Sequence, residues 1–180
     1  MRAIAVFCGS QNGKNPAYRQ DAEKLGKQLA RAGIRLIYGG GHKGLMRTLA
    51  DAVLAGGGEV TGVIPEVLVE WEQQHTGISE LIVVSDMHTR KRMMYDLADA
   101  AVIMPGGFGT LDEFFEMLTW NQLKIHDKPI FILNTNGFYD RMVEHLNTME
   151  QEGFLYGSPW EKIKVSGSPD ELVRWISAHE

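Results

Sequence analysis

The chain contains 180 residues, of which 44% are hydrophobic, and its formal net charge at pH 7 is -5. This length and apolar content are sufficient for one domain with a full core. The acidic balance argues against general affinity for nucleic acids or anionic membranes, because both require a basic face that displaces counterions. We therefore expect no nucleic-acid or membrane partner, and any phosphate that the protein binds must be held locally.

The sequence contains one cysteine, Cys8, which excludes an intrachain disulfide framework. The apolar run that ends at this residue is too short for a signal peptide or a membrane span. These features favour a cytoplasmic protein. Cys8 has no evident base partner, so we interpret it as a small buried hydrophobe and not as a nucleophile.

Apolar runs of strand length recur along the chain, with helix-period segments between most of them. The first helix is expected to begin at Pro16, behind an Asn15 cap, and to end at Gly33. Predicted strands cover Ala3–Cys8, Arg35–Tyr38, Val60–Ile64, Leu81–Val84, Ala100–Met104 and Ile130–Leu133. The later helices are expected at Leu45–Ala55, Met87–Asp99, Thr110–Leu123, Phe138–Gln151 and Pro169–Ala178. This alternation predicts a single doubly wound, Rossmann-like α/β domain over residues 1–180, with a mostly parallel sheet flanked by helices.

Ligands of such domains gather at the carboxyl ends of the strands. Three loops there contain glycine: Gly9-Ser10, Gly39 to Gly44, and Pro105 to Thr110. The third loop, with Gly106, Gly107, Phe108 and Gly109, lies where a strand must turn into a helix. Its glycines let the main chain approach an anion, and the N–H groups and dipole of the following helix favour negative charge. The loop therefore predicts a phosphate-binding turn.

Glu113 follows this turn inside the same predicted helix. A carboxylate cannot attract phosphate, so its position indicates a chemical role in an enzyme that acts on a small phosphorylated molecule. The alternative is a capping box, in which Glu113 bonds back to the Thr110 N–H. A shared helical stripe with Met117 and Trp120 favours the chemical role, because apolar surroundings suit a group that transfers protons. Its neighbours Asp112 and Glu116 are expected to be rim or solvent charges.

The Gly39 to Gly44 loop matches G-x-G-x-x-G, but the match is weak. The loop follows the second strand, and the acid that should bind a ribose would be Glu59, at the wrong end of the next strand. Leu45 follows Gly44, so the loop is not a P-loop. Two interpretations stay open for Gly40 and Gly41: a tight turn with close packing, or a loop that contacts a nucleotide other than NAD.

A basic run opposes the macrodipole at the start of the helix that Asp86 caps. Violations of local rules are often functional. Arg90 shares a stripe with apolar positions and should face the core, where a guanidinium needs an anionic partner; the stripe contains Met87, Met94, Leu97 and Ala101. Arg92 is expected on the outer face, paired with Asp96.

The helix after the phosphate turn is apolar on nearly every side, with Leu111, Phe114, Phe115, Met117, Leu118 and Trp120. One sheet cannot cover this surface. Either a homodimer interface covers it, or the helix lies deep in the core. The six histidines are scattered without the spacing or nearby acids of a metal site, so we expect neither a metal nor a cofactor.

With these residues in view, the chain resembles the LONELY GUY family of cytokinin riboside 5'-monophosphate phosphoribohydrolases, a group formerly labelled possible lysine decarboxylase. The likeness extends over nearly the whole chain. It rests on Cys8-Gly9-Ser10, Tyr38 to Gly41 with Gly44-Leu45-Met46, Asp86 to Lys91, Pro105 to Glu113, Thr119-Trp120 and His126 to Pro129. One position departs: plant members have a Glu upstream of the Arg-Lys pair, where this chain has Gln74. The departure bears on base selectivity.

The resemblance implies hydrolysis of the N-glycosidic bond of a nucleoside 5'-monophosphate, AMP or an N6-modified AMP, as in cytokinin activation. It assigns catalysis to Arg90 and Glu113. It implies that the substrate is bound by Gly9, Ser10, Gly40, Gly41, Met87, Lys91, Gly106, Gly107, Phe108, Gly109, Thr110 and Thr119. The alternative is a carrier of nucleotide or molybdenum cofactor with a similar fold, against which the Arg90 and Glu113 pair argues. A pyridoxal decarboxylase is disfavoured, because neither Lys43 nor Lys91 has a visible partner set.

Overall fold

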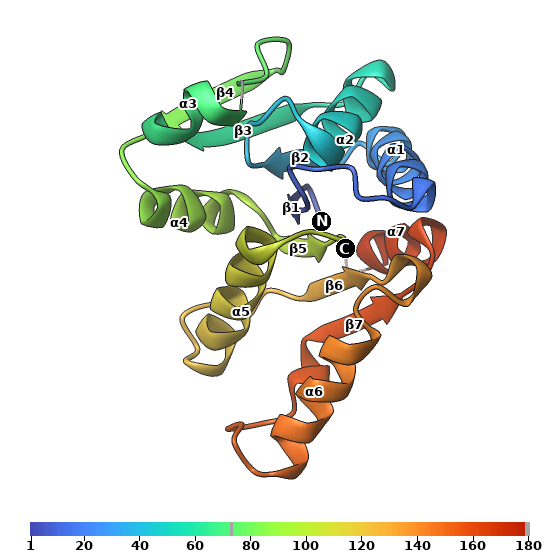
Figure 1. Cartoon of the computed structure of the whole chain (residues 1–180), viewed down its shortest axis with the longest axis vertical. Helices are drawn as coiled ribbons and strands as arrows, with labels where there is room; N and C mark the ends of the chain where they lie inside the picture. The colour runs from blue at the N-terminus through green and yellow to red at the C-terminus, as the bar shows by residue number, and fades with distance from the viewer. Residues whose placement is uncertain (73, 179–180) are drawn as a thin grey trace.

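The computed structural model describes residues 1–72 and 74–178. Its centre is a sheet of seven strands, all parallel, in the order β4-β3-β2-β1-β5-β6-β7 (Figure 1). The strands are β1 (Ala3–Phe7), β2 (Arg35–Tyr38), β3 (Val60–Pro65), β4 (Glu80–Val84), β5 (Ala100–Ile103), β6 (Ile130–Leu133) and β7 (Ile163–Ser166). The predicted doubly wound α/β domain is confirmed, with a parallel sheet throughout the described residues.

Seven α-helices and two 3-10 turns connect these strands within the described part of the chain. The helices are α1 (Pro16–Arg31), α2 (Gly44–Ala55), α3 (Glu66–Glu72), α4 (Met87–Leu97), α5 (Phe108–Gln122), α6 (Asp140–Gln151) and α7 (Pro169–Ser177). The 3-10 turns are η1 (Thr135–Gly137) and η2 (Pro159–Glu161). Asn15 caps α1 as predicted, because its Oδ1 accepts a hydrogen bond of 2.9 Å from the Ala17 N–H.

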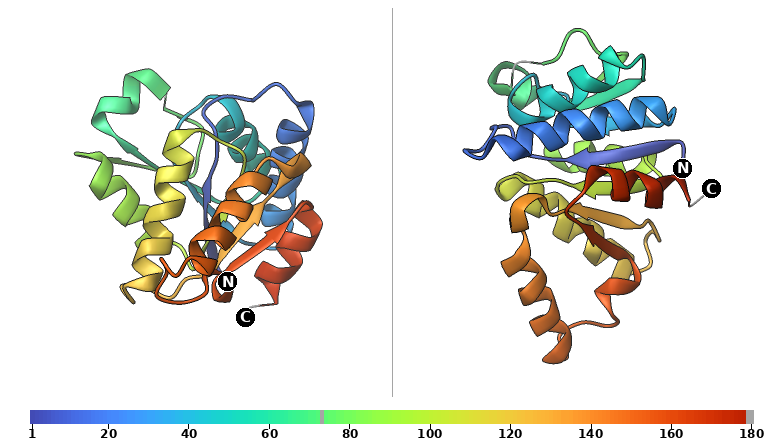
Figure 2. Two further views of the ribbon diagram at one scale, coloured as in Figure 1. Left: turned by 60° about the horizontal axis from the view of Figure 1, so that its bottom comes forward. Right: turned by 90° about the vertical axis from the view of Figure 1, so that its right-hand side faces the viewer.

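Helices cover both faces of the sheet (Figure 2), and an apolar layer of side chains lies on each face. Along β1, Ile4 and Val6 pack toward α1, α2 and α7, whereas Ala3, Ala5 and Phe7 pack toward α4, α5 and α6. This alternation follows the two-residue period of a strand. Since β1 is buried on both faces, its sequence is continuously apolar.

The chain order reverses between β1 and β5. From β1 the chain proceeds outward to β2, β3 and β4, then returns to β5 on the other side of β1 and continues to β7. The loops that leave β1 and β5 at their carboxyl ends therefore diverge to opposite faces of the sheet. Such a switch point creates the crevice in which ligands of open α/β sheets bind.

Several predicted helix bounds differ from the structure, and two of these differences affect the arguments about the site. Helix α5 begins at Phe108 behind Gly107, two residues before the predicted start at Thr110, so Thr110 is not the cap that the capping-box alternative requires. Helix α4 ends at Leu97 and not at Asp99, which places Ala101 on β5, outside the stripe assigned to it. In both cases the residues near the helix boundary include glycine or alanine, so the sequence only weakly indicated where the helix begins or ends.

Candidate active site

A cavity of about 400 Å³ lies at the switch point. It contains Arg90 of α4 and Glu113 of α5, and we call it the Arg90–Glu113 cavity. Its wall is completed by the end of β1, the loop behind it, the glycine turn and several apolar side chains: Val6, Phe7, Cys8, Gly9, Ser10, Gly39, Met46, Leu68, Met87, Gly107, Phe108, Gly109 and Thr110. The structure thus brings together segments from five separate parts of the chain at the edge of the sheet where a ligand was expected.

Arg90 faces the core, as its position on the helix predicts, and only 5% of it is exposed. Its Nε donates to the Val63 carbonyl at 3.0 Å, and its Nη2 donates to the Gly39 carbonyl at 2.8 Å. Its Nη1 lies 3.8 Å from the sulfur of Met87. These contacts fix the guanidinium as a positive charge at the cavity wall.

Gly39 has to be glycine because of Arg90. A Cβ atom added at Gly39 would overlap Nη2 of Arg90 and also approach the sulfur of Met46. Gly40, with φ of 76°, packs instead near Ile64 and Leu81, and Gly41 pairs with Gln74. Neither Gly40 nor Gly41 lines the Arg90–Glu113 cavity. Within this loop, therefore, the residue that reaches the site is Gly39, which sequence reasoning did not single out.

Glu113 is 8% exposed and lies at the end of α5 that borders the cavity. Its carbonyl accepts a hydrogen bond of 2.9 Å from the Tyr95 hydroxyl, which also lies 3.2 Å from Oε2 of Glu116. Burial, with added repulsion from the charges of Glu116 and Glu113, raises the pKa of Tyr95 far above its ordinary value. Tyr95 is thus a permanent hydrogen-bond donor that ties α5 to α4 beside the carboxylate.

The first turn of α5 offers its main-chain N–H groups to the cavity. No side chain caps this helix, and Gly107 and Gly109 are exposed, with nothing within 4 Å of the place where a Cβ would lie. Gly106 is tightly packed instead: a Cβ there would overlap the Thr110 side chain. Gly106 borders an adjoining cavity that shares Gly9, Ser10 and Gly107 with the first. Uncapped N–H groups and the helix dipole at this end suit an anion such as phosphate.

Like Gly40, Gly41 and Gly106, two more of the predicted substrate contacts do not line the Arg90–Glu113 cavity. Lys91 projects toward α5, where its Nζ lies 3.0 Å from Asp112 Oδ2 and 3.1 Å from Glu116 Oε1. Burial acts to lower the pKa of Lys91, but the bonds to Asp112 and Glu116 outweigh it, so the pKa is raised. Thr119 lies further along α5, where its hydroxyl donates to the Phe115 carbonyl at 2.8 Å.

The apolar wall that Leu68 and Met46 provide was not predicted. Leu68 belongs to α3, which sequence analysis missed because it is short and lacks a clear apolar period. Met46 was noted only as part of the segment that follows Gly44. Apolar side chains give no chemical signal in a sequence, so their place in a site is decided by folding.

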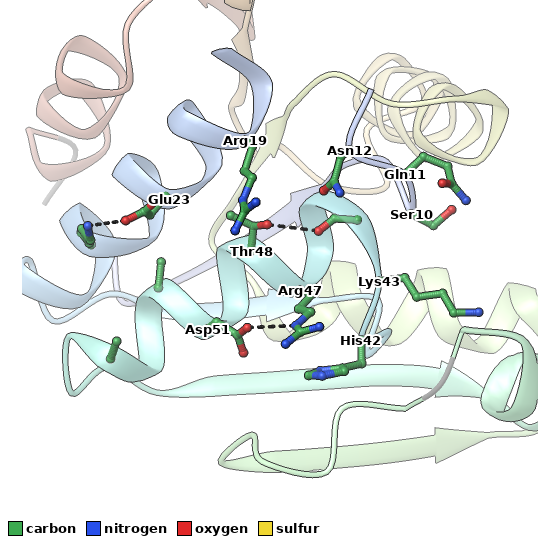
Figure 3. Close-up of a pocket in the computed structure, with 14 residues that line it drawn as sticks. Ser10, Gln11, Asn12, Arg19, Glu23, His42, Lys43, Arg47, Thr48 and Asp51 are labelled. Carbon is green, nitrogen blue, oxygen red and sulfur yellow. Dashed lines mark hydrogen bonds and ion pairs between the residues drawn. The ribbon is translucent and has the colours of Figure 1, made fainter. Parts of the chain in front are cut away.

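A larger cavity, of about 760 Å³, lies elsewhere, between α1 and α2 (Figure 3). Six of its 14 lining residues are charged, and they include the ion pairs of Lys27 with Glu23 and of Arg47 with Asp51. The smaller Arg90–Glu113 cavity is the better candidate for chemistry, because it combines a buried cation, a buried carboxylate and unoccupied main-chain donors.

The prediction that no histidine has a metal-site neighbourhood is wrong. His42, Asp51 and His75 each present a possible ligand atom within 4.8 Å of the others. They are 9 and 24 residues apart along the chain, counted from Asp51 to His42 and to His75, so the short spacings of known metal motifs could not reveal them. Burial and the neighbouring His75 lower the pKa of His42. Separately, no helix in the described residues has the length and apolar character needed to cross a lipid bilayer.

The amino-acid sequence of this chain is similar to those of known proteins. A family model described as "Possible lysine decarboxylase" matches residues 46–176. A cytokinin riboside 5'-monophosphate phosphoribohydrolase of Rhodococcoides fascians is 46% identical over 165 residues, which cover 91% of this chain and 83% of the relative. A protein of the same description from Arabidopsis thaliana is 42% identical over 181 residues, covering 99% of this chain and 82% of the relative.

Solved structures with the same fold are more distant in sequence. The molybdenum cofactor binding protein of Rippkaea orientalis superposes with a TM-score of 0.75 at 21% identity, covering 98% of this chain and 96% of the other. The molybdenum cofactor carrier protein of Chlamydomonas reinhardtii has a TM-score of 0.75 at 20% identity, with the same coverage. These two matches establish the fold alone. By its full-length relatives and its family model, the chain belongs to the LONELY GUY family of cytokinin riboside 5'-monophosphate phosphoribohydrolases.

Proposed function

We propose that this protein hydrolyses the N-glycosidic bond of a nucleoside 5'-monophosphate, releasing the free base and ribose 5-phosphate. The substrates are AMP or an N6-modified AMP such as isopentenyladenosine monophosphate, and the second would make the reaction a cytokinin activation. The observation that carries the proposal is the meeting of Arg90, Glu113 and the uncapped start of α5 in one cavity. Relatives 46% and 42% identical, which bear this activity in their names, support it.

The phosphate is held at the glycine turn. In this proposal the main-chain N–H groups of Gly107 to Thr110, which line the cavity, bind the phosphate, and Gly9, Ser10 and Gly106 of the adjoining wall contact it. A bound phosphate holds the nucleotide in one orientation relative to the catalytic residues. Such positioning can supply a large share of the rate enhancement. Met87 borders the space left for the rest of the nucleotide.

Glu113 then acts on the anomeric carbon. Its carboxylate stabilises the positive charge that develops as the bond from carbon to the base nitrogen breaks, and it accepts a proton from the attacking water. The water oxygen forms the new bond to carbon, and the base leaves with the bonding electron pair and takes up a proton. Arg90 orients the phosphate and ribose hydroxyls and balances the charge of Glu113.

Two other functions fit less well. A carrier without chemistry shares this fold, but binding alone does not require a buried carboxylate beside a phosphate turn, because the charge opposes the phosphate. A pyridoxal-dependent decarboxylase needs a lysine in the site, and no lysine is among the described residues that line the Arg90–Glu113 cavity. Lys91 is bonded to two carboxylates outside it.

The substrate prediction is tested by incubating the purified protein with AMP and with adenosine, followed by chromatography. We expect adenine from AMP and none from adenosine, which lacks the phosphate that the α5 turn binds. A competition between isopentenyladenosine monophosphate and AMP measures which base the enzyme prefers. This measurement is needed because Gln74 stands where plant members of the family have Glu. Equal release from adenosine and AMP would contradict phosphate anchoring.

The role of Glu113 is tested with Glu113→Gln. We expect kcat to fall at least about 100-fold, the scale of acid–base and electrostatic groups, while AMP still binds. The matched control is Glu144→Gln, which changes an exposed carboxylate on α6 that does not line the cavity. Its kcat should stay within a few-fold of wild type. Full activity of Glu113→Gln would remove the proposed mechanism.

We also propose that the protein is a homodimer in the cytoplasm. Helix α5 is not a deep core helix: Phe114 and Met117 are buried, but Phe115 is 37% exposed and Phe108 is 95% exposed. Leu123 and Ile125 extend this apolar surface beyond the helix end. An exposed apolar surface of this kind is typical of a subunit interface. The cytoplasmic location rests on the single reduced cysteine, Cys8.

A further inference from the structure

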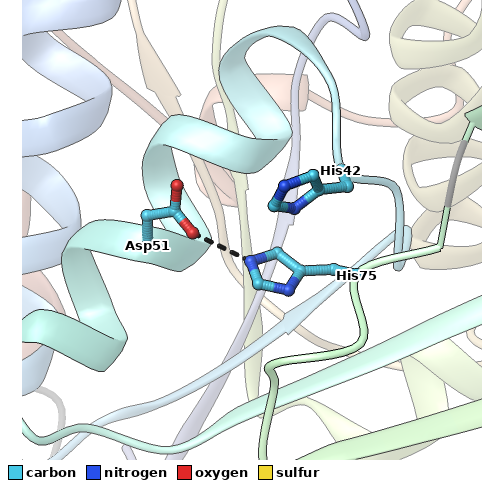
Figure 4. A group of neighbouring side chains, drawn as sticks. All are labelled: His42, Asp51 and His75. Atoms are coloured by element: carbon cyan, nitrogen blue, oxygen red, sulfur yellow. Dashed lines mark hydrogen bonds and ion pairs between the residues drawn. The ribbon is translucent and has the colours of Figure 1, made fainter.

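Three side chains that commonly bind metals meet beside α2 (Figure 4), and none of them lines the Arg90–Glu113 cavity. His42 lies in the loop between β2 and α2, Asp51 lies on α2, and His75 lies in the segment between α3 and β4. We propose that this group, the His42–Asp51–His75 cluster, binds a divalent cation of the zinc type. The inference is independent of the proposed hydrolysis.

The separations suit such an ion. His75 Nε2 lies 2.9 Å from Asp51 Oδ1, and possible ligand atoms of all three residues lie within 4.8 Å of one another. Bonds of about 2.0–2.2 Å in a tetrahedral site hold ligand atoms roughly 3.4 Å apart, a value between these two limits. Asp51 is about half exposed and can turn to adjust its carboxylate. Two imidazoles and one carboxylate, with water in the fourth position, match the donor preference of zinc.

His42 provides the observation that points to a ligand. Its Nδ1 is enclosed, and no hydrogen-bond partner for this atom occurs among the described residues. The ring packs edge to face against His75, with the ring centroids 4.3 Å apart. A buried polar nitrogen without a partner is costly, and a bound ion is one of its ordinary explanations. His42 and Asp51 also line the large cavity between α1 and α2, which gives a cation access from solvent.

Binding of a cation would change the hydrogen bonds that His75 makes. The Gly77 N–H donates to its Nδ1 at 3.2 Å, so in the metal-free state Nε2 carries the proton and donates to Asp51. A cation at Nε2 requires this proton to be on Nδ1, so the Gly77 N–H loses its acceptor. Gly77 is exposed, and its N–H can then bond to water.

Arg47 should weaken binding of a cation at this site, and this expectation can be tested. Its Nε lies 3.2 Å from Asp51 Oδ2, so it competes for one ligand and places a positive charge beside the site. A purely structural role for the His75–Asp51 bond makes no prediction about this arginine in a zinc titration. A metal site predicts that neutralising Arg47 strengthens binding.

A bound cation would fasten the loop behind β2 to the segment behind α3. These segments already share a 3.0 Å hydrogen bond from the His75 N–H to the Gly40 carbonyl and a bridge between Gly41 and Gln74. The carbonyl of Gly39, in the same loop, accepts from Arg90. The site is therefore placed to stabilise the main chain that supports one wall of the catalytic cavity.

The experiment titrates the full chain, stripped with a chelator, with zinc in competition with a chromogenic chelator, and repeats the titration with cobalt(II) as a spectroscopic probe. We expect one equivalent to bind and the cobalt form to show the strong visible absorption of a tetrahedral site. His42→Ala and Asp51→Asn should each weaken zinc binding at least about 10-fold. Arg47→Gln should strengthen it several-fold.

The control is His145→Ala, which removes an exposed imidazole on α6. It should bind zinc as the wild type does. Asp51→Asn keeps the shape of a half-exposed side chain and so serves even if His42→Ala fails to fold. Absence of stoichiometric zinc binding, or equal affinities for His42→Ala, Asp51→Asn and His145→Ala, would overturn the inference and leave the cluster as a hydrogen-bonded link between α2 and the segment behind α3.

Discussion

Main-chain carbonyls hold the guanidinium of Arg90 in place. The Val63 carbonyl at the inner part of the sheet and the Gly39 carbonyl in the loop behind β2 each accept one of its N–H groups. The planar fork of arginine suits such a two-sided arrangement, which lysine cannot reproduce. The position of the Arg90 guanidinium therefore depends on Gly39 having no side chain.

Gly39→Ala should therefore impair catalysis by displacing Arg90. Because an added Cβ would overlap Nη2, the guanidinium must move, and a displacement of about 1 Å can cost roughly 100-fold in rate. We expect kcat/KM for AMP to fall roughly 10- to 100-fold. Gly157→Ala is the control, because a Cβ there would meet nothing within 4 Å.

A double-mutant cycle separates this effect from general destabilisation. If Gly39 acts through Arg90, the Gly39→Ala change should cost little more activity in an Arg90→Ala background, so the two effects are not additive. Additive losses, or a loss of kcat/KM that follows the melting temperature alone, would contradict positioning of Arg90 by Gly39.

Helices α4 and α5 are joined beside the active site by a small polar network. Lys91 is 7% exposed and bonds to Asp112 and Glu116, while Tyr95 bonds to Glu116 and to the carbonyl of Glu113. Lys91 and Asp112 are the sequence neighbours of Arg90 and Glu113, and Tyr95 and Glu116 lie on the same two helices. The network therefore links the two helices that carry Arg90 and Glu113.

Lys91→Met should destabilise the fold by about 1–3 kcal/mol. Removing the cation leaves two carboxylates at i,i+4 without their partner; breaking a fully buried pair costs more, but Asp112 is more than half exposed and is screened by solvent. Arg92→Met on the same helix is the control. Its pair with Asp96 is exposed, so we expect less than about 1 kcal/mol. Urea denaturation measures both, and equal losses would contradict a structural role for Lys91.

The whole molecule leaves an apolar surface uncovered along α5. If a second copy of the chain covers Phe108 and Phe115, which are exposed in the single chain, light scattering after gel filtration should give twice the mass of one chain. Phe115→Glu should give a monomer, since a charge in the centre of the interface cannot be solvated. Val83→Glu, on the edge strand β4, should stay dimeric. A monomeric wild type would contradict the proposed assembly.

The predictability of each strand follows how continuously apolar its sequence is. Six of the seven strands were found because they contain an unbroken apolar run, and these include β4 at one edge of the sheet. Strand β7 at the other edge was missed, because exposed Lys164 interrupts its short run. Helix α3 was missed for a similar reason, since a seven-residue helix offers too few turns for a period to appear. The glycine turn with Arg90 and Glu113 was found because these residue types violate local rules where they stand.

By itself, the sequence determined the alternation of strands and helices, the glycine turn before α5, and the positions of Arg90 and Glu113 next to the cavity, because backbone preference and charge can be read from short segments. Only the tertiary structure decided that Gly39 accommodates Arg90, that Lys91 turns to α5, and that His42, Asp51 and His75 converge. These contacts join residues up to 51 positions apart in the chain. Their distances are set by the packing of helices on the sheet, which no local pattern encodes.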